Sequence, residues 1–179
     1  MRRSRSIFLS FAMTVALFAS HATDASAQVI RPSQAAEIMQ WVGGTKIDIT
    51  YHRPVARGRE LFGKLVPFDK VWSPSADTAA TFTISTPISV NGSALAQGSY
   101  SVWAIPGATE WTLIFSSIPV VHHMFYPANK DVLRVKSVPR QGDKLETLGI
   151  YFPMVDADSA EMVIHWGTTI VPLKIKSRK

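Results

Sequence analysis

The chain has 179 residues and no cysteine, and its 19 basic and 13 acidic side chains give a net charge of +6. The lack of cysteine excludes disulfide scaffolds, thiolate metal sites, a cysteine nucleophile and a lipid-anchored N-terminal cysteine. Much of the positive charge lies near the two ends of the chain, so the charge is weak evidence for nucleic-acid binding, and we expect no nucleic-acid partner.

The first 27 residues have the three parts of a cleavable signal peptide. Arginines occupy positions 2, 3 and 5, an apolar run covers 7–19, and Ala25-Ser26-Ala27 supplies the small residues of a cleavage site. The apolar run is shorter than the about 20 residues of a membrane-spanning helix, and no later segment approaches that length. We therefore expect an exported, soluble protein without an integral membrane span, located in the periplasm or outside the cell.

A tail at 28–34 is expected to precede the folded domain, which we place at 35–176. Residues 33–42 fit either a short amphipathic helix or a first strand, because Ala35 and Ala36 favour a helix whereas Trp41-Val42 favours an extended end. Clear alternation begins after that, where Ile47, Ile49 and Tyr51 share one face of a predicted strand.

Residues 52–80 interrupt the alternation. A connection of this length in a compact domain is usually either functional or disordered. This one contains apolar side chains that can fold back on a core, so we predict a long ordered connection. These side chains are Leu61, Phe62, Leu65, Val66, Phe68, Val71 and Trp72.

Period-two alternation returns at Phe82 and continues almost to the C-terminus. Asn91-Gly92 predicts a tight hairpin, because a type I′ turn needs a positive φ at both central residues. Gly167-Thr168 is interpreted as a turn between two late strands, and Pro172 places the last strand at a sheet edge or at a bulge. We predict an all-β, single-domain antiparallel β-sandwich of about 8–9 short strands, with a small barrel as the alternative, followed by a basic tail at 177–179.

Residues 51–81 also carry a specific pattern. It consists of Tyr51-x-Arg53-Pro54, Arg57-Gly58-Arg59, Phe62-Gly63-x-Leu65-Val66-Pro67-Phe68 and a tryptophan at Trp72. Together with Gly98-Ser99-Tyr100-Ser101, Ile105-Pro106-Gly107 and Lys130-Asp131, this pattern resembles the domain-of-unknown-function 2911 family of exported bacterial proteins over about residues 35–176. The resemblance implies a strand at 33–42 and supplies no reaction. The chain departs from the family pattern at Ser73-Pro74-Ser75-Ala76-Asp77, where an Arg-x-Gly-Ala-Asn run is typical.

The arginines of the connection are the strongest candidates for a binding site. Guanidinium groups match carboxylates, phosphates and acidic sugars through paired hydrogen bonds. We predict a patch for an anionic small molecule or glycan, made of Arg53, Arg57, Arg59, Trp72 and Asp77. The alternative is structural, with the arginines paired to acids of the same connection and pinning it to the sheet. Those acids are Glu60, Asp69 and Asp77.

No pattern marks a catalytic centre. There is no Gly-x-Ser-x-Gly or Ser-x-x-Lys motif, no glycine-rich phosphate loop and no distinctive carboxylate pair. His122 and His123 are adjacent, so they would face opposite sides of a strand or need a special turn in a loop. We predict no catalytic residue, no metal and no cofactor.

The function expected from these features is a non-catalytic binding or envelope-associated module. One alternative is an uncharacterised hydrolase or metal-dependent enzyme that uses His52 and Asp77. A second alternative is a structural partner of an envelope protein, which would bind that protein partner through an edge strand near Pro172.

Overall fold

The computed structural model describes residues 32–178. The predicted signal peptide at 1–27, residues 28–31 of the predicted tail and Lys179 lie outside the described residues. Within residues 32–178 there are ten strands and no helix, and hence no helix that could cross a membrane.

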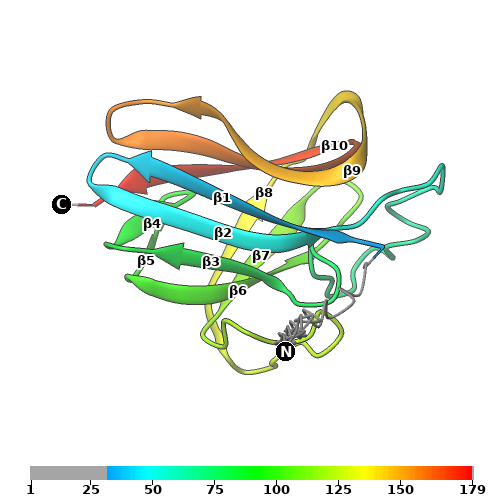
Figure 1. Cartoon of the computed structure of the whole chain (residues 1–179), viewed down its shortest axis with the longest axis horizontal. Coiled ribbons are helices and arrows are strands. Elements are labelled where there is room, and N and C mark those ends of the chain that lie inside the picture. Colours follow the sequence, from blue (N-terminus) through cyan, green and yellow to red (C-terminus); the bar gives the residue numbers. More distant parts are fainter. Residues whose placement is uncertain (1–31, 179) are drawn as a thin grey trace, which may run out of the picture.

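The strands form two antiparallel sheets that lie as separate layers (Figure 1). The six-stranded sheet has the order β1-β2-β3-β6-β7-β8, and the four-stranded sheet has the order β5-β4-β10-β9. The first sheet contains β1 (Gln34–Val42), β2 (Thr45–Arg53), β3 (Ala80–Ile84), β6 (Gly98–Ile105), β7 (Trp111–Ser116) and β8 (Asp131–Ser137). The second contains β4 (Ile88–Val90), β5 (Ser93–Leu95), β9 (Arg140–Val155) and β10 (Ser159–Ser177). The predicted β-sandwich is confirmed, with two long strands, β9 and β10, that we did not expect.

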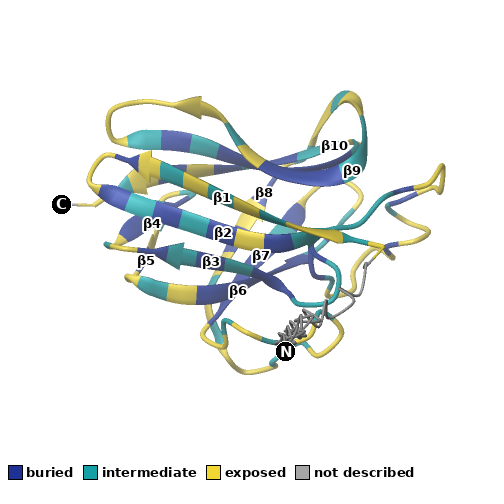
Figure 2. Cartoon of the chain, viewed as in Figure 1, coloured by how far each residue is buried: buried dark blue, intermediate teal, exposed yellow. Residues whose placement is uncertain are grey.

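The core lies between the sheets and follows the predicted alternation. Along β2, Ile47, Ile49 and Tyr51 are buried, and the dark and light bands of the strand show the period of two (Figure 2). Ile164 and Trp166 of β10 reach the same apolar cluster from the other sheet. The inward faces of both sheets thus share one core.

The ambiguous segment at the start of the fold is a strand. β1 pairs with β2 along its full length, from Gln34 opposite Arg53 to Val42 opposite Thr45. The helix interpretation is therefore wrong and the strand implied by the family resemblance is right. The Asn91-Gly92 hairpin is confirmed, with φ values of +46° and +85° at its two residues.

Of two predictions about the last strand, the turn is wrong, and the edge-or-bulge alternative is right only for the bulge. β10 runs without a turn through Gly167, whose φ of +60° accompanies register shifts against β9 on both sides, so the residue forms a bulge. β10 is not an edge strand, because it lies between β4 and β9, but it does carry a bulge, which was the other alternative. Pro172 falls between the end of the β9 pairing at Ile170 and the start of the β4 pairing at Ile175, so its missing N–H interrupts neither ladder. The structural-partner alternative therefore does not have the edge strand that it assumed at Pro172.

Candidate functional site

The connection between β2 and β3 is ordered, as predicted, and packs onto both sheets. Val55 bridges to Thr147 of β9, and Leu148 N donates to Pro54 O at 2.9 Å. Further along, Trp72 and Ala104 of β6 exchange two backbone hydrogen bonds of 2.8 Å. The connection therefore covers one end of the sandwich and is fixed to each layer.

Trp72 contributes to this attachment through its ring. It is half-buried and stacks parallel to Trp166 of β10 with ring centroids 6.1 Å apart. Phe62 of the connection lies edge-on to Trp72 at 5.8 Å and to Trp111 of β7 at 4.7 Å. We call Phe62, Trp72, Trp111 and Trp166 the aromatic cluster. The structure thus places one predicted patch residue, Trp72, against the core.

The arginine-rich part of the connection forms a tight turn. Arg59 N donates to Ala56 O at 3.1 Å, and the two residues between them have left-handed backbones, with φ of +52° at Arg57 and +70° at Gly58. Positive φ at both central positions is the mark of a type I′ turn, where asparagine, aspartate and glycine dominate. An arginine there adopts a conformation that costs a residue with a Cβ roughly 1–2 kcal/mol.

Neighbouring side chains hold this turn in place. The Arg59 guanidinium donates from Nε to Ala56 O and from Nη2 to Val55 O, both at 2.8 Å. Gly58 N donates to Glu146 Oε1 of β9 at 3.0 Å, and this bond is the main reason that the pKa of Glu146 lies below its usual value. The turn is therefore fixed from inside by Arg59 and from the neighbouring sheet by Glu146.

The three predicted arginines consequently differ in their contacts. Arg53 donates from Nε to Leu148 O at 2.9 Å, and Arg59 bonds the carbonyls of its own turn. Within residues 32–178, neither pairs with an acid of the connection. Arg57 is exposed, and its guanidinium makes no hydrogen bond or ion pair within the same part of the chain. The pinning role foreseen as the alternative thus falls to Arg53, through a carbonyl of β9, whereas Arg59 closes its own turn.

A groove of about 290 Å³ adjoins the turn. Ala56 and Arg59, which flank Arg57 and Gly58, form one side, and Lys144 and Thr168 also line it. Phe62 and Trp166 of the aromatic cluster contribute apolar surface. Glu60 lines the groove as well, so it is not uniformly positive.

The fifth predicted patch residue, Asp77, lies near a different connection. Its carbonyl accepts a hydrogen bond of 2.9 Å from His123 N, in the segment between β7 and β8. The structure therefore brings Arg57 and Arg59 together in one turn, and sets Trp72 in the aromatic cluster and Asp77 beside His123.

His52, of the alternative enzyme hypothesis, lies on β2. Its N–H donates to Ser75 Oγ at 2.9 Å, and its Nδ1 is buried without a hydrogen-bond partner among residues 32–178. It lines a groove of about 430 Å³ together with Thr50 and Thr78. Among residues 32–178, no three histidine, aspartate or glutamate side chains gather in a way that could hold a metal ion.

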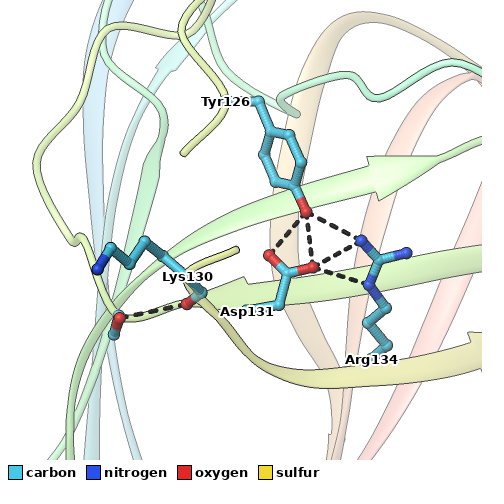
Figure 3. A network of polar contacts seen from close by, with 5 residues as sticks. Tyr126, Lys130, Asp131 and Arg134 are labelled. Atoms are coloured by element: carbon cyan, nitrogen blue, oxygen red, sulfur yellow. Dashed lines mark hydrogen bonds and ion pairs between the residues drawn. The ribbon is translucent and has the colours of Figure 1, made fainter. Parts of the chain in front are cut away.

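Sequence reasoning missed two polar clusters. In the first, Tyr126 OH donates to Asp131 at 2.6 Å, and Arg134 Nε donates to the same carboxylate at 2.8 Å (Figure 3). Burial raises the pKa of Tyr126, and the hydrogen bond to Asp131 raises it further. Tyr126 also lies edge-on to the buried Trp103 at 5.2 Å, so this network fixes the end of the β7–β8 connection. The Asp131-x-x-Arg134 spacing was the one local signal for it.

In the second cluster, His165 is buried and both of its ring nitrogens are engaged. Nε2 lies 2.9 Å from Asp143 O and Nδ1 lies 2.9 Å from Tyr151 OH. A carbonyl can only accept, so Nε2 carries the proton and the Tyr151 hydroxyl donates to Nδ1. This pair borders a groove of about 490 Å³ that Arg53 also lines. Nothing in the spacing of Tyr151 and His165 indicated it.

Comparison with known proteins identifies a family that matches this chain. The family model described as "Protein of unknown function (DUF2911)" matches residues 33–175, most of the chain. No curated protein and no solved structure matches.

Proposed function

The chain belongs to the DUF2911 family of proteins of unknown function, and we propose that it is an exported binding module that takes an anionic ligand at the turn around Arg57. The predicted signal peptide at 1–27 supports the export. The main support for a binding site comes from Arg57. Its backbone is left-handed, and its guanidinium is exposed without a protein partner within the described residues.

A backbone in this region is stable only when its surroundings hold it there, and such residues gather at ligand-binding and active sites. Here Arg59 and Glu146 supply that support. An arginine whose role was to pin the connection would bond protein groups, as Arg53 does with Leu148. The guanidinium of Arg57 instead meets no acceptor among the described residues, so its donors are open to solvent or to a ligand.

The groove beside the turn limits the size and charge of the ligand. Its volume of about 290 Å³ is at the lower end of small-molecule pockets, which suits a ligand of about one sugar ring. Lys144 and Arg59 favour a negative group, whereas Glu60 disfavours a second one. We therefore infer a sugar-sized molecule with one carboxylate or phosphate, placed so that this group pairs with Arg57.

The test is a thermal shift of the chain from Gln28 onward, which contains all ten strands. The probes are inorganic phosphate, glucuronate and glucose 6-phosphate, each with and without a chelator. A ligand that binds the native state raises the melting temperature by mass action. We expect a chelator-insensitive rise with at least one sugar probe, and its loss in Arg57→Ala.

Lys64→Ala is the matched control, because it removes another exposed cation from the same connection. We expect it to keep the full shift. The proposal is wrong if the wild-type protein responds to none of the probes, or if Arg57→Ala responds as strongly as the wild type. A chelator-sensitive shift that disappears in His52→Ala would instead support the enzyme hypothesis.

A further inference from the structure

The connection between β7 and β8, residues 117–130, is held firmly yet exposes large side chains. Ala79 N donates to Val121 O at 2.9 Å, and Thr81 Oγ1 donates to Pro119 O at 3.0 Å. Despite this support, Met124 and Phe125 are 72% and 70% exposed. An ordered loop that exposes large apolar side chains is typical of a site for a ligand or a partner.

A turn within this connection brings two histidine rings together. Phe125 N donates to His122 O at 2.9 Å, which closes a turn over residues 122–125. The rings of His122 and His123 have centroids 4.7 Å apart and planes inclined by 46°. Adjacent residues on a strand point to opposite faces, so this turn supplies the arrangement that the sequence alone required.

The separation suits two ligands of one metal ion. With metal–nitrogen distances of about 2.0–2.1 Å, two imidazoles on a shared ion have ring centres roughly 5 Å apart. His122 and His123 stand close to that separation. Met124 follows in the same turn, and its thioether moves on three rotatable bonds.

We propose that His122, His123 and Met124 form a surface site for Cu(I). Thioether and imidazole ligands favour this soft ion, whereas a zinc site needs about four ligands of nitrogen, sulfur or oxygen type. Among residues 32–178, no third histidine or acidic side chain is placed to complete such a zinc site. The site is separate from the anion-binding turn and does not depend on it.

The local charges suit an ion at this place. His123 lies beside Asp77, whose backbone carbonyl accepts the His123 N–H at 2.9 Å. The carboxylate of Asp77 interacts electrostatically with the His123 ring, and its negative charge would offset the charge of the ion.

One hydrogen bond has to change when His122 binds through Nε2. Met124 N donates to His122 Nδ1 at 3.3 Å, which places the ring proton on Nε2. Coordination through Nε2 moves that proton to Nδ1 and breaks this bond. The bond is long for its type, so losing it is a small penalty.

The experiment is a competition for Cu(I) between the chain from Gln28 onward and the chromophoric chelator bicinchoninate, under nitrogen with ascorbate. We expect one equivalent of Cu(I) to be retained by the wild-type protein. His123→Gln and Met124→Leu should each weaken retention by about tenfold or more, since each removes one of three ligands. Met124 is exposed and His123 is half-buried in the turn, and circular dichroism checks that the variants are folded.

Met154→Leu is the matched control, because Met154 is also exposed and lies on β9. It should retain Cu(I) like the wild type, as should Arg57→Ala, so that failure here is distinct from failure of the anion site. The proposal is overturned if the wild-type protein retains no Cu(I), if both ligand variants retain it unchanged, or if an equal concentration of Zn(II) displaces it.

Discussion

At the scale of the residue, Arg57 allows the cost of its conformation to be measured separately from its charge. Arg57→Ala removes the guanidinium and keeps the Cβ, whereas Arg57→Gly removes both. The left-handed region destabilises a residue with a Cβ by roughly 1–2 kcal/mol, and glycine avoids this cost. Glycine also makes the unfolded chain more flexible, which offsets about 0.5–1 kcal/mol of the stability gained. We expect Arg57→Gly to unfold with a free energy about 0.5–1 kcal/mol higher than Arg57→Ala, measured by urea denaturation.

Both variants should fail to respond to the anionic probes, so the glycine variant would gain stability and lose binding. If Arg57→Gly is instead less stable than Arg57→Ala, the left-handed backbone carries no strain. The argument that links Arg57 to a ligand would then lose its premise.

The same residues show the limit of sequence reasoning at this scale. The sequence was sufficient to select Arg53, Arg57 and Arg59 as candidates, because it shows three arginines within seven residues, although Arg53 ends β2 and only the other two lie in the connection. It could not separate their roles, because Arg53 bonds Leu148 of β9, far along the chain, and Glu146 of the same strand holds the turn that contains Arg57. His122 and His123 are a parallel case, because the backbone bond to Phe125 that turns their rings together is not written in their spacing.

At the scale of the element, the bulge in β10 is the point at which the connection between β2 and β3 packs against the second sheet. A Cβ built on Gly167 would lie 2.9 Å from Leu61 Cδ1, and Leu61 is buried. Gly167→Ala therefore combines the cost of a left-handed φ with a steric conflict against the connection. We expect a loss of about 2 kcal/mol in the free energy of unfolding, measured by urea denaturation.

Gly92→Ala is the control, because Gly92 also has a positive φ, of +85°, but no atom of the described residues lies within 4 Å of its added Cβ. It should lose only the conformational part, about 1 kcal/mol. Equal losses in the free energy of unfolding of the two variants would mean that Leu61 moves aside freely. The bulge would then not hold the connection in a fixed position.

Elements were predictable wherever one face of a strand meets the core. In β2, Ile47, Ile49 and Tyr51 alternate with polar residues because the inner face of the strand is buried and the outer face is not. This difference between the two faces produces a period of two that is visible in the sequence. The turn predicted at Gly167 and the edge position considered for Pro172 were wrong for a related reason. A glycine suits a turn and a bulge equally, and a proline is tolerated at an edge and also between two ladders, so only the strand pairing distinguishes the cases.

At the scale of the whole molecule, the aromatic cluster joins three parts of the fold. Phe62 belongs to the connection, Trp111 to the six-stranded sheet and Trp166 to the four-stranded sheet. The centroid of Phe62 lies 4.7 Å from that of Trp111 and 6.3 Å from that of Trp166. One side chain of the connection thus contacts both layers, so the connection belongs to the cooperative core and is not a loop attached to it.

This arrangement predicts how the protein unfolds when Phe62 is replaced by alanine. Truncating a phenylalanine in a packed cluster costs about 3–5 kcal/mol, a large share of the roughly 5–15 kcal/mol that stabilises a domain. Because the cluster joins both sheets, we expect the urea midpoints of tryptophan fluorescence and far-ultraviolet circular dichroism to fall together. Phe68→Ala is the matched control from the same connection, and since Phe68 is 38% exposed it should cost far less. If the fluorescence midpoint fell while the circular dichroism midpoint stayed, the connection would unfold independently. The sandwich would then be stable without its cover, and the support that holds the turn at Arg57 would be local to that turn.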